Sequence, residues 1–113
     1  MSVPADLLIA YEATKLDLPP VEANRPRFVL TAQRPFGDPL TPAENDRRHR
    51  ALGDHLSRSR IAAVEVAAHD PDGTVEQCWG VTCTRAQVIR LCRLFEQHGY
   101  FEVTLAAHHF VKV

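Results

Sequence analysis

A four-residue turn in the second half of the chain constrains the fold more than any other feature. Asp70-Pro71-Asp72-Gly73 joins two runs, residues 61–68 and 75–82, in which apolar and β-branched residues recur. Aspartate, proline and glycine each favour a tight turn for a separate backbone reason. The pattern therefore predicts a β-hairpin, which commits this part of the chain to an antiparallel pair of strands.

A second strong signal marks the start of a helix. Thr41-Pro42-Ala43-Glu44 combines a capping box with proline at the first helical position. The threonine hydroxyl can accept from the glutamate amide, and the glutamate carboxylate can accept from the threonine amide. We expect the helix to run to about Leu56. Its thin apolar stripe of Ala51, Leu52 and Leu56 predicts a surface helix that covers a sheet mainly through its second half.

Thr84 predicts the start of another helix, with the hydroxyl as its cap. Four apolar residues follow at the spacing of one helical face, namely Val88, Leu91, Cys92 and Phe95. We expect His98 in the last turn and Gly99 as the left-handed residue that ends this helix.

Two further strands complete the predicted core. Residues 28–32 form a short apolar run between turn-forming residues, which favours a buried central strand. Residues 100–107 form another strand. Residues 108–113 either continue it or return beside it, because no glycine marks a turn.

The resulting order is β-α-β-β-α-β, which predicts an α+β fold. The sheet is antiparallel or mixed and resembles a split βαβ arrangement, with two helices on one face. We expect an N-terminal extension made of a short helix over residues 4–11, an edge strand over 13–18 and a linker to Pro26. Residues 1–113 are predicted to form a single domain, with 27–113 as its core.

The charge balance disfavours non-specific electrostatic binding to nucleic acids or anionic lipids. The chain has 13 Lys and Arg against 14 Asp and Glu, and a formal net charge of −1. Its N-terminus lacks the basic and apolar pattern of a signal peptide, so we expect a cytoplasmic protein with free thiols and no membrane partner. The spacing of Cys78 and Cys83 does not fit a zinc knuckle, and we expect neither a metal nor a cofactor.

Several segments together resemble the domain of unknown function 3293 family. The longest is the run from Thr31 to Thr41 followed by Glu44-Asn45, and the match rests on the order and spacing of the segments together. Three others occur in the same order: Tyr11-Glu12-Ala13-Thr14, Asp70-Pro71-Asp72-Gly73 and Phe95-Glu96-Gln97. The chain departs from the family pattern at Gln33-Arg34, where an aromatic residue and Asn are usual. The resemblance implies a bacterial or phage origin and a compact α/β fold, and it implies no reaction.

The junction between the first core strand and the helix after it is the main candidate for a ligand or partner site. A loop that leaves a strand and enters a helix often carries function, and helix N-termini attract anions. The candidate residues are Gln33, Arg34, Phe36, Glu44, Asn45, Arg48 and Gln97. Arg34 and Arg48 could clamp a phosphate or carboxylate. Alternatively Glu44 serves the capping box, Phe36 closes the edge of the core and the arginines are solvated.

The histidines offer weaker candidates. His69 and Asp70 are adjacent, so in a regular strand they point to opposite faces and cannot act as a pair. The same argument separates His108 from His109, and no role follows for His98.

No catalytic residues can be assigned from these patterns, and whether the protein is an enzyme stays open. The leading hypothesis is a non-enzymatic module that binds a protein partner or a second copy of itself. The alternative is a small enzyme or ligand-binding protein that acts on a phosphate-containing or nucleic-acid substrate through residues 33–48. Nucleic-acid binding by the arginines of the 42–56 helix is disfavoured, because acidic residues are interspersed with them.

Overall fold

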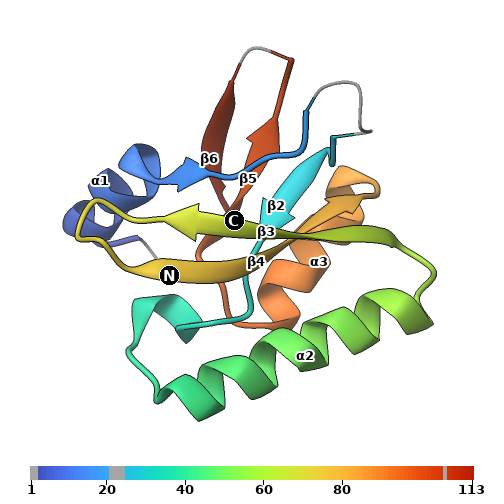
Figure 1. Cartoon of the computed structure of the whole chain (residues 1–113), viewed down its shortest axis with the longest axis horizontal. Coiled ribbons are helices and arrows are strands. Elements are labelled where there is room, and N and C mark those ends of the chain that lie inside the picture. The colour runs from blue at the N-terminus through green and yellow to red at the C-terminus, as the bar shows by residue number, and fades with distance from the viewer. Residues whose placement is uncertain (1–2, 21–24, 106) are drawn as a thin grey trace.

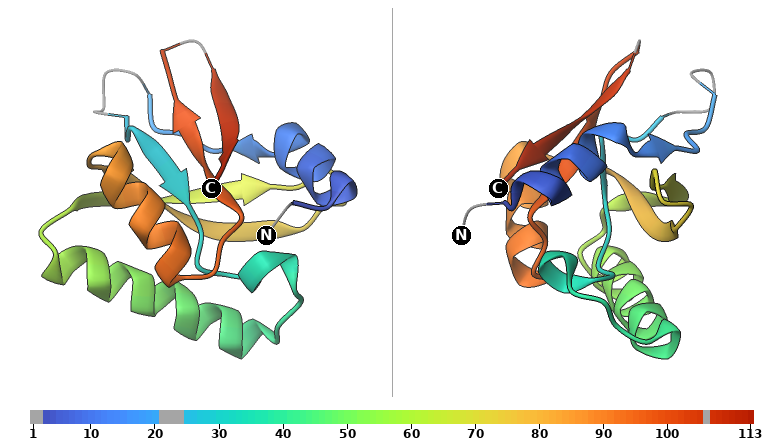
Figure 2. Two further views of the ribbon diagram at one scale, coloured as in Figure 1. Left: turned by 180° about the vertical axis from the view of Figure 1, so that it is seen from behind. Right: turned by 90° about the vertical axis from the view of Figure 1, so that its left-hand side faces the viewer.

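The computed structural model describes residues 3–20, 25–105 and 107–113. It contains a six-stranded sheet in the order β1-β3-β4-β2-β5-β6, in which every neighbouring pair is antiparallel. The sheet is strongly curled, and the β5–β6 hairpin rises from one end of it (Figures 1 and 2). The strands are β1 (Lys15–Leu16), β2 (Phe28–Leu30), β3 (Ala62–His69), β4 (Val75–Thr82), β5 (Gly99–Val103) and β6 (His108–Lys112). This arrangement confirms the predicted α+β class.

The four inner strands reproduce the predicted β-α-β-β-α-β order. Helix α2 (Pro42–Arg58) follows β2, and helix α3 (Arg85–Leu94) follows β4. Both begin with a complete capping box, at Thr41 with Glu44 and at Thr84 with Gln87. The two helices lie on the same face of the sheet (Figure 2).

The two faces of the sheet carry separate apolar clusters because side chains alternate along each strand. Phe28 and Leu30 of β2 face the helices and pack against Leu52 of α2 and Val88 of α3. Val29 points the other way, into a smaller cluster that receives residues from the chain ends. Its other members are Val66, Ala68, Cys78 and Phe101. The second cluster explains why the chain ends must fold back over the sheet.

The β3–β4 hairpin matches the expected turn. Ala62 pairs with Thr82 and His69 with Val75, so the register holds along both strands. The turn is closed by main-chain hydrogen bonds from Gly73 to Asp70 and from Asp70 to Thr74. Near this turn, β3 also pairs with the short strand β1, and Lys15 lies opposite His69.

Two details of the helices differ from expectation. In α2, Ala51 is exposed, and the buried positions are His49, Leu52 and Leu56. His49 is buried because its ring stacks on Trp79 at 4.9 Å, and its main-chain oxygen accepts from the indole nitrogen at 3.0 Å. After the end of α3 at Leu94, the left-handed residue is Glu96, with φ of 58°.

Gly99 is therefore not the helix stop. It is the first residue of β5, where a Cβ would lie 2.0 Å from the main-chain oxygen of Val111. Close packing of β6, and not a positive φ, requires glycine at this position.

The ends of the chain lie against the rest of the fold. Helix α1 (Ala5–Ala13) contacts β6, and Tyr11 stacks on Phe110 with ring centroids 4.5 Å apart. No residue of α1 itself is buried. The C-terminal segment forms a separate strand, β6, which settles the alternative that the sequence left open.

Candidate functional site

A cavity of about 200 Å³ opens between three segments that are distant in the sequence: helix α1, the loop after β2 and the β3–β4 turn. We call it the α1 pocket. Figure 1 shows α1 and the β3–β4 turn side by side at one end of the molecule. Its lining residues are Leu7, Ala10, Tyr11, Thr31, Gln33, Arg34, Gly37, Asp70, Pro71, Asp72, Glu76 and Gln97.

Arg34 is placed by an unusual backbone. Both Arg34 and Phe36 have left-handed φ values, 48° and 51°, which cost free energy in residues with a side chain. Hydrogen bonds hold the loop in this shape. The Arg34 amide donates to Oδ1 of Asn45 at 2.9 Å, and the Phe36 amide donates to the main-chain oxygen of Glu96 at 2.7 Å. Neighbouring elements therefore hold Arg34 and Phe36 in this shape, and Gly37, with φ of 82°, supplies a third left-handed residue at no such cost.

The Arg34 guanidinium lies between two carboxylates. Its Nη1 is 3.9 Å from Oδ2 of Asp70 and 3.8 Å from Oε1 of Glu76. Both carboxylate side chains are only 15% exposed. Thr14 fixes Asp70 from the other side, because its hydroxyl donates to Oδ1 at 2.9 Å. These contacts connect the loop, the turn and the end of α1 around one cavity.

Burial changes the acidity of the groups in the pocket. Desolvation and the nearby charge of Asp70 raise the pKa of Glu76 from 4.5 to about 7, against the opposing effect of Arg34. Desolvation also raises the pKa of Asp70, although the hydrogen bond from Thr14 opposes it. For Tyr11, burial and the charge of Glu76 raise the pKa to about 12. Glu76 therefore titrates near neutral pH, while Tyr11 keeps its proton.

A smaller void of about 20 Å³ lies behind the α1 pocket and shares its inner wall. Tyr11, Asp70 and Glu76 line both spaces, and the far side of the void is apolar, with Cys78 and Phe101 among its residues. Burial raises the pKa of the Cys78 thiol well above its usual range. This thiol stays protonated and is a poor nucleophile.

Three of the residues expected at the site line the pocket. Gln33 spans the loop: its Oε1 accepts from the Gln77 amide at 3.0 Å, and its Nε2 donates to the oxygen of Asn45 at 3.4 Å. Gln97 donates to the oxygen of Gln33 at 3.1 Å. Arg34 is the third. Gln33 and Gln97 thus line the pocket and also make the hydrogen bonds that hold its wall together.

The other expected residues lie behind or beside the pocket. Arg48 donates through Nε to the main-chain oxygen of Ala32 and through Nη2 to that of Phe95 at 2.6 Å. It therefore links the segment after β2 to the segment after α3. Asn45 holds the loop, as described above. Phe36 packs its ring against His98 at 5.3 Å. Glu44 serves the capping box and does not line the pocket. Arg34 and Arg48 therefore do not form an anion clamp together.

The histidine pairs behave as strand geometry predicts. Nε2 of His69 lies 2.6 Å from Oδ2 of Asp17, while Asp70 turns toward the pocket. His108 donates to the main-chain oxygen of Thr14 at 3.0 Å, and His109 lies near Glu102 on the opposite side. Among the described residues, no three His, Cys, Asp or Glu side chains gather as metal ligands would.

Three important residues of the pocket were not among those expected at this site: Tyr11, Asp70 and Glu76, of which Asp70 was considered only as a partner of His69. The signal for Glu76 is its place in β4, where it alternates with Gln77 and shares a face with Cys78, which is buried. A charged residue on the buried face of a strand is unusual. Tyr11 and Asp70 belong to two of the motifs that carried the family resemblance.

Comparison with known families agrees with the resemblance. A family described as a protein of unknown function (DUF3293) matches residues 30–99, which is more than half of the 113 residues. The chain belongs to this family. No curated protein and no solved structure matches it. The matched range contains Arg34, Asp70 and Glu76, whereas Tyr11 on α1 lies outside it.

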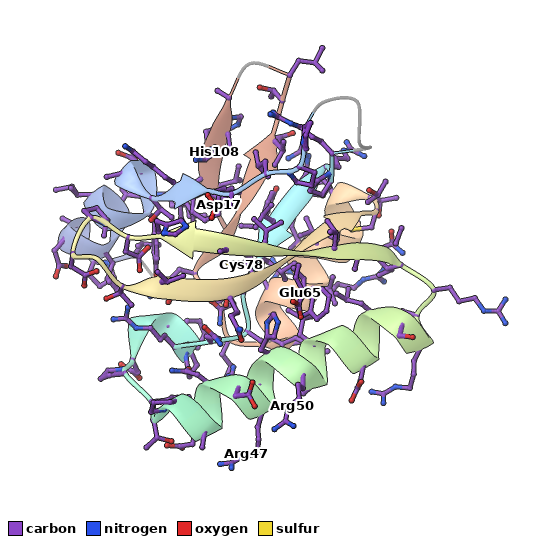
Figure 3. The ribbon with its side chains drawn as sticks, in the orientation of Figure 1. Asp17, Arg47, Arg50, Glu65, Cys78 and His108 are labelled. Atoms are coloured by element: carbon purple, nitrogen blue, oxygen red, sulfur yellow. The ribbon has the colours of Figure 1, made fainter. Side chains whose placement is uncertain are left out.

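The exposed surface of α2 offers weaker evidence of a binding site. Arg47 and Arg50 point away from the sheet (Figure 3), and Arg50 pairs with Asp46 at 3.0 Å on the same helix. None of the helices that the structure describes has the length and apolar character of a membrane span.

Proposed function

We propose that this protein is a non-enzymatic binding module whose ligand enters the α1 pocket. The observation that carries the proposal is the convergence of Arg34, Asp70 and Glu76 on one cavity, from two separate segments, with Tyr11 of α1 as the opposite wall. Concave cavities with a few convergent polar groups are the usual form of ligand sites. A volume of about 200 Å³ suits a small molecule or a single side chain of a partner.

Nucleophilic catalysis by Tyr11, or by the Cys78 thiol behind the pocket, is disfavoured by the protonation state of these groups. Tyr11 and Cys78 both have pKa values raised by burial, so they stay in their protonated forms at neutral pH. Arg34 is engaged with two carboxylates. A phosphate ligand is disfavoured because Asp70, Asp72 and Glu76 outnumber Arg34, the one cation that lines the pocket among the described residues.

The test uses a pair of substitutions on the same helix. Ala10 lines the pocket, and Ala13 is exposed outside it. Ala10→Phe should fill the cavity, while Ala13→Phe adds the same bulk in solvent. A panel of amines, carboxylates, amides and sugar phosphates is titrated into ¹⁵N-labelled protein, with the Gly37 amide as the reporter inside the pocket. We expect a compound that shifts Gly37 in wild type and Ala13→Phe but not in Ala10→Phe. Binding that survives Ala10→Phe would refute this location.

A second candidate function rests on a groove between α2 and α3. This groove of about 430 Å³ is lined by His55 and Ile61 on one side and by Arg90, Leu91 and Leu94 on the other. Leu94 is 60% exposed and therefore offers apolar surface at the edge of this groove. The cationic and apolar lining favours an acidic amphipathic helix of a protein partner, bound through its leucines and glutamates.

The probe for this groove is a labelled helical peptide with the repeat Glu-Leu-Leu-Glu. Fluorescence anisotropy should show binding to wild type that Leu94→Glu removes, because the new carboxylate repels the peptide and the apolar contact is lost. Val75→Glu, at a half-exposed valine of β4, is the matched control. Equal binding to Leu94→Glu and wild type would rule the groove out as the docking site.

A further inference from the structure

We propose that the α1 pocket takes a positively charged nitrogen, an ammonium or a guanidinium on a short alkyl chain, held between the carboxylates of Asp70 and Glu76 in place of Arg34. This inference rests on the proposed binding function and names the chemical class of its ligand. The same group could come from a free amine or from a lysine or arginine side chain of a partner.

The first support is the supply of hydrogen-bond acceptors in the pocket. A carboxylate can accept about four hydrogen bonds. Within the described residues, Asp70 accepts one side-chain hydrogen bond, from Thr14, and Glu76 accepts none. Arg34 approaches both at 3.8–3.9 Å, which is ion-pair distance and too long for a hydrogen bond. The acceptor capacity of both carboxylates is thus largely unused among the described residues.

The second support is the sign of the charge. Three carboxylates and one guanidinium line the cavity. At a partly buried site the surplus negative charge attracts a cation and repels an anion more strongly than it would in water. Arg34 acts as an internal counter-ion for the empty site. Because it makes no close hydrogen bond to either carboxylate, a ligand cation can displace it at small cost.

The third support is the shape of the lining. Leu7 and Ala10 on α1 and Pro71 on the turn provide an apolar rim around the polar floor. Such a rim suits the hydrocarbon part of an alkylammonium or alkylguanidinium, whose charged end then reaches the carboxylates.

Binding of a cation should release a proton. The titratable and charged groups around Glu76 are Tyr11 on α1, Arg34 on the loop, Asp70 and Asp72 on the turn, and Cys78 and His98 behind it. Burial raises the pKa of Glu76 to about 7, so near pH 7 it is half protonated in the empty pocket. A cation stabilises the ionised form, and about half a proton should leave for each ligand bound at about pH 7. Affinity should therefore rise about tenfold from about pH 6 to about pH 8.

The experiment compares four probes of similar size: butylguanidinium, butylammonium, the neutral butylurea and the anionic butyrate. Calorimetry in buffers of different ionisation enthalpy measures affinity and proton release, and the Gly37 amide confirms the location. We expect the two cations to bind and the other two to fail. A short capped peptide with one arginine, compared with its glutamine counterpart, tells a partner side chain from a free amine.

Variants then separate a cation site from an anion site. Glu76→Gln should weaken cation binding and remove its dependence on pH, with Asp70→Asn as a second variant at the other carboxylate. Arg34→Gln should strengthen cation binding by about threefold to tenfold because the internal competitor is gone. Glu12→Gln removes an exposed carboxylate outside the α1 pocket and should change nothing.

The outcomes distinguish the two proposals. If butyrate or butylurea shifts Gly37 and the cations do not, the pocket binds ligands but the cation class is wrong. Weaker binding of cations by Arg34→Gln would overturn the inference in the same way. If no cation binds at concentrations up to about 10 mM, the inference also fails, even if another compound of the broader panel binds in the pocket.

Discussion

Glu76→Gln should make the folded protein more stable at neutral and alkaline pH. In the unfolded chain Glu76 loses its proton near its ordinary pKa of 4.5, whereas in the folded protein burial delays the loss to about 7. Between these values the folded state holds a proton that the unfolded state has released. The free energy of unfolding therefore falls as pH rises through this window and is constant above it.

The magnitude follows from the two pKa values. A tenfold change in an acidity constant is worth about 1.4 kcal/mol, so the shift from 4.5 to about 7 costs the folded state about 3 kcal/mol above pH 7. Glutamine is neutral at every pH and avoids this cost. The wild type and the variant should thus diverge by about 3 kcal/mol between about pH 4 and about pH 8.

Urea denaturation across that range measures the difference between the two proteins. Taking the difference matters because Asp70 has a raised pKa too, while hydrogen bonds lower the pKa of Glu44 and Glu102. Glu44 and Glu102 are present in both proteins and cancel, whereas the contribution of Asp70 differs between them because its charge interacts with that of Glu76. Glu12→Gln controls for the loss of one charge. A difference between wild type and Glu76→Gln that stays flat over the whole range would refute the burial argument.

Three further substitutions test the fold by chemical denaturation. Gly53→Ala should destabilise by about 1 kcal/mol despite the better helix propensity, because the new Cβ would lie 2.6 Å from Cζ2 of Trp79; a more stable variant would contradict this packing. Arg48→Ala should cost about 2–4 kcal/mol, since two main-chain oxygens lose a charged donor, while the exposed Arg47→Ala should cost almost nothing. Thr84→Ala should cost about 1 kcal/mol through the loss of its cap, and an unchanged midpoint would show that the capping box contributes little.

The parts of the fold that the sequence predicted are those that local chemistry decides. The Asp70–Gly73 turn and the caps at Thr41 and Thr84 depend on residues within four positions of one another, and each is found in place. The failure at Gly99 has the opposite cause. The end of α3 is set by contacts with distant residues, because Arg48 donates to the oxygen of Phe95 and the oxygen of Glu96 accepts from the loop after β2. Local residue patterns cannot predict such contacts between distant parts of the chain.

The site divides in the same way. The loop after β2 was a prediction from its turn residues, and Arg34 does line the pocket. Glu44 was expected at the same site because it is close in sequence, but its carboxylate accepts from the Thr41 amide and does not line the pocket. Tyr11 could not be joined to Arg34 and Glu76 from the sequence, because α1 is placed at the pocket by its packing against β6, at the other end of the chain.

The shallow attachment of α1 has a kinetic consequence. This helix buries none of its residues and is held chiefly at its C-terminal end, by the Tyr11–Phe110 stack and the contacts of Thr14 with Asp70 and His108. The core clusters lie elsewhere, so α1 can detach while the sheet and the other helices stay folded. Its amides should exchange with solvent deuterium faster than those of α3. The residence time of a ligand in the pocket would then depend on how often one helix opens, and not on the stability of the whole molecule.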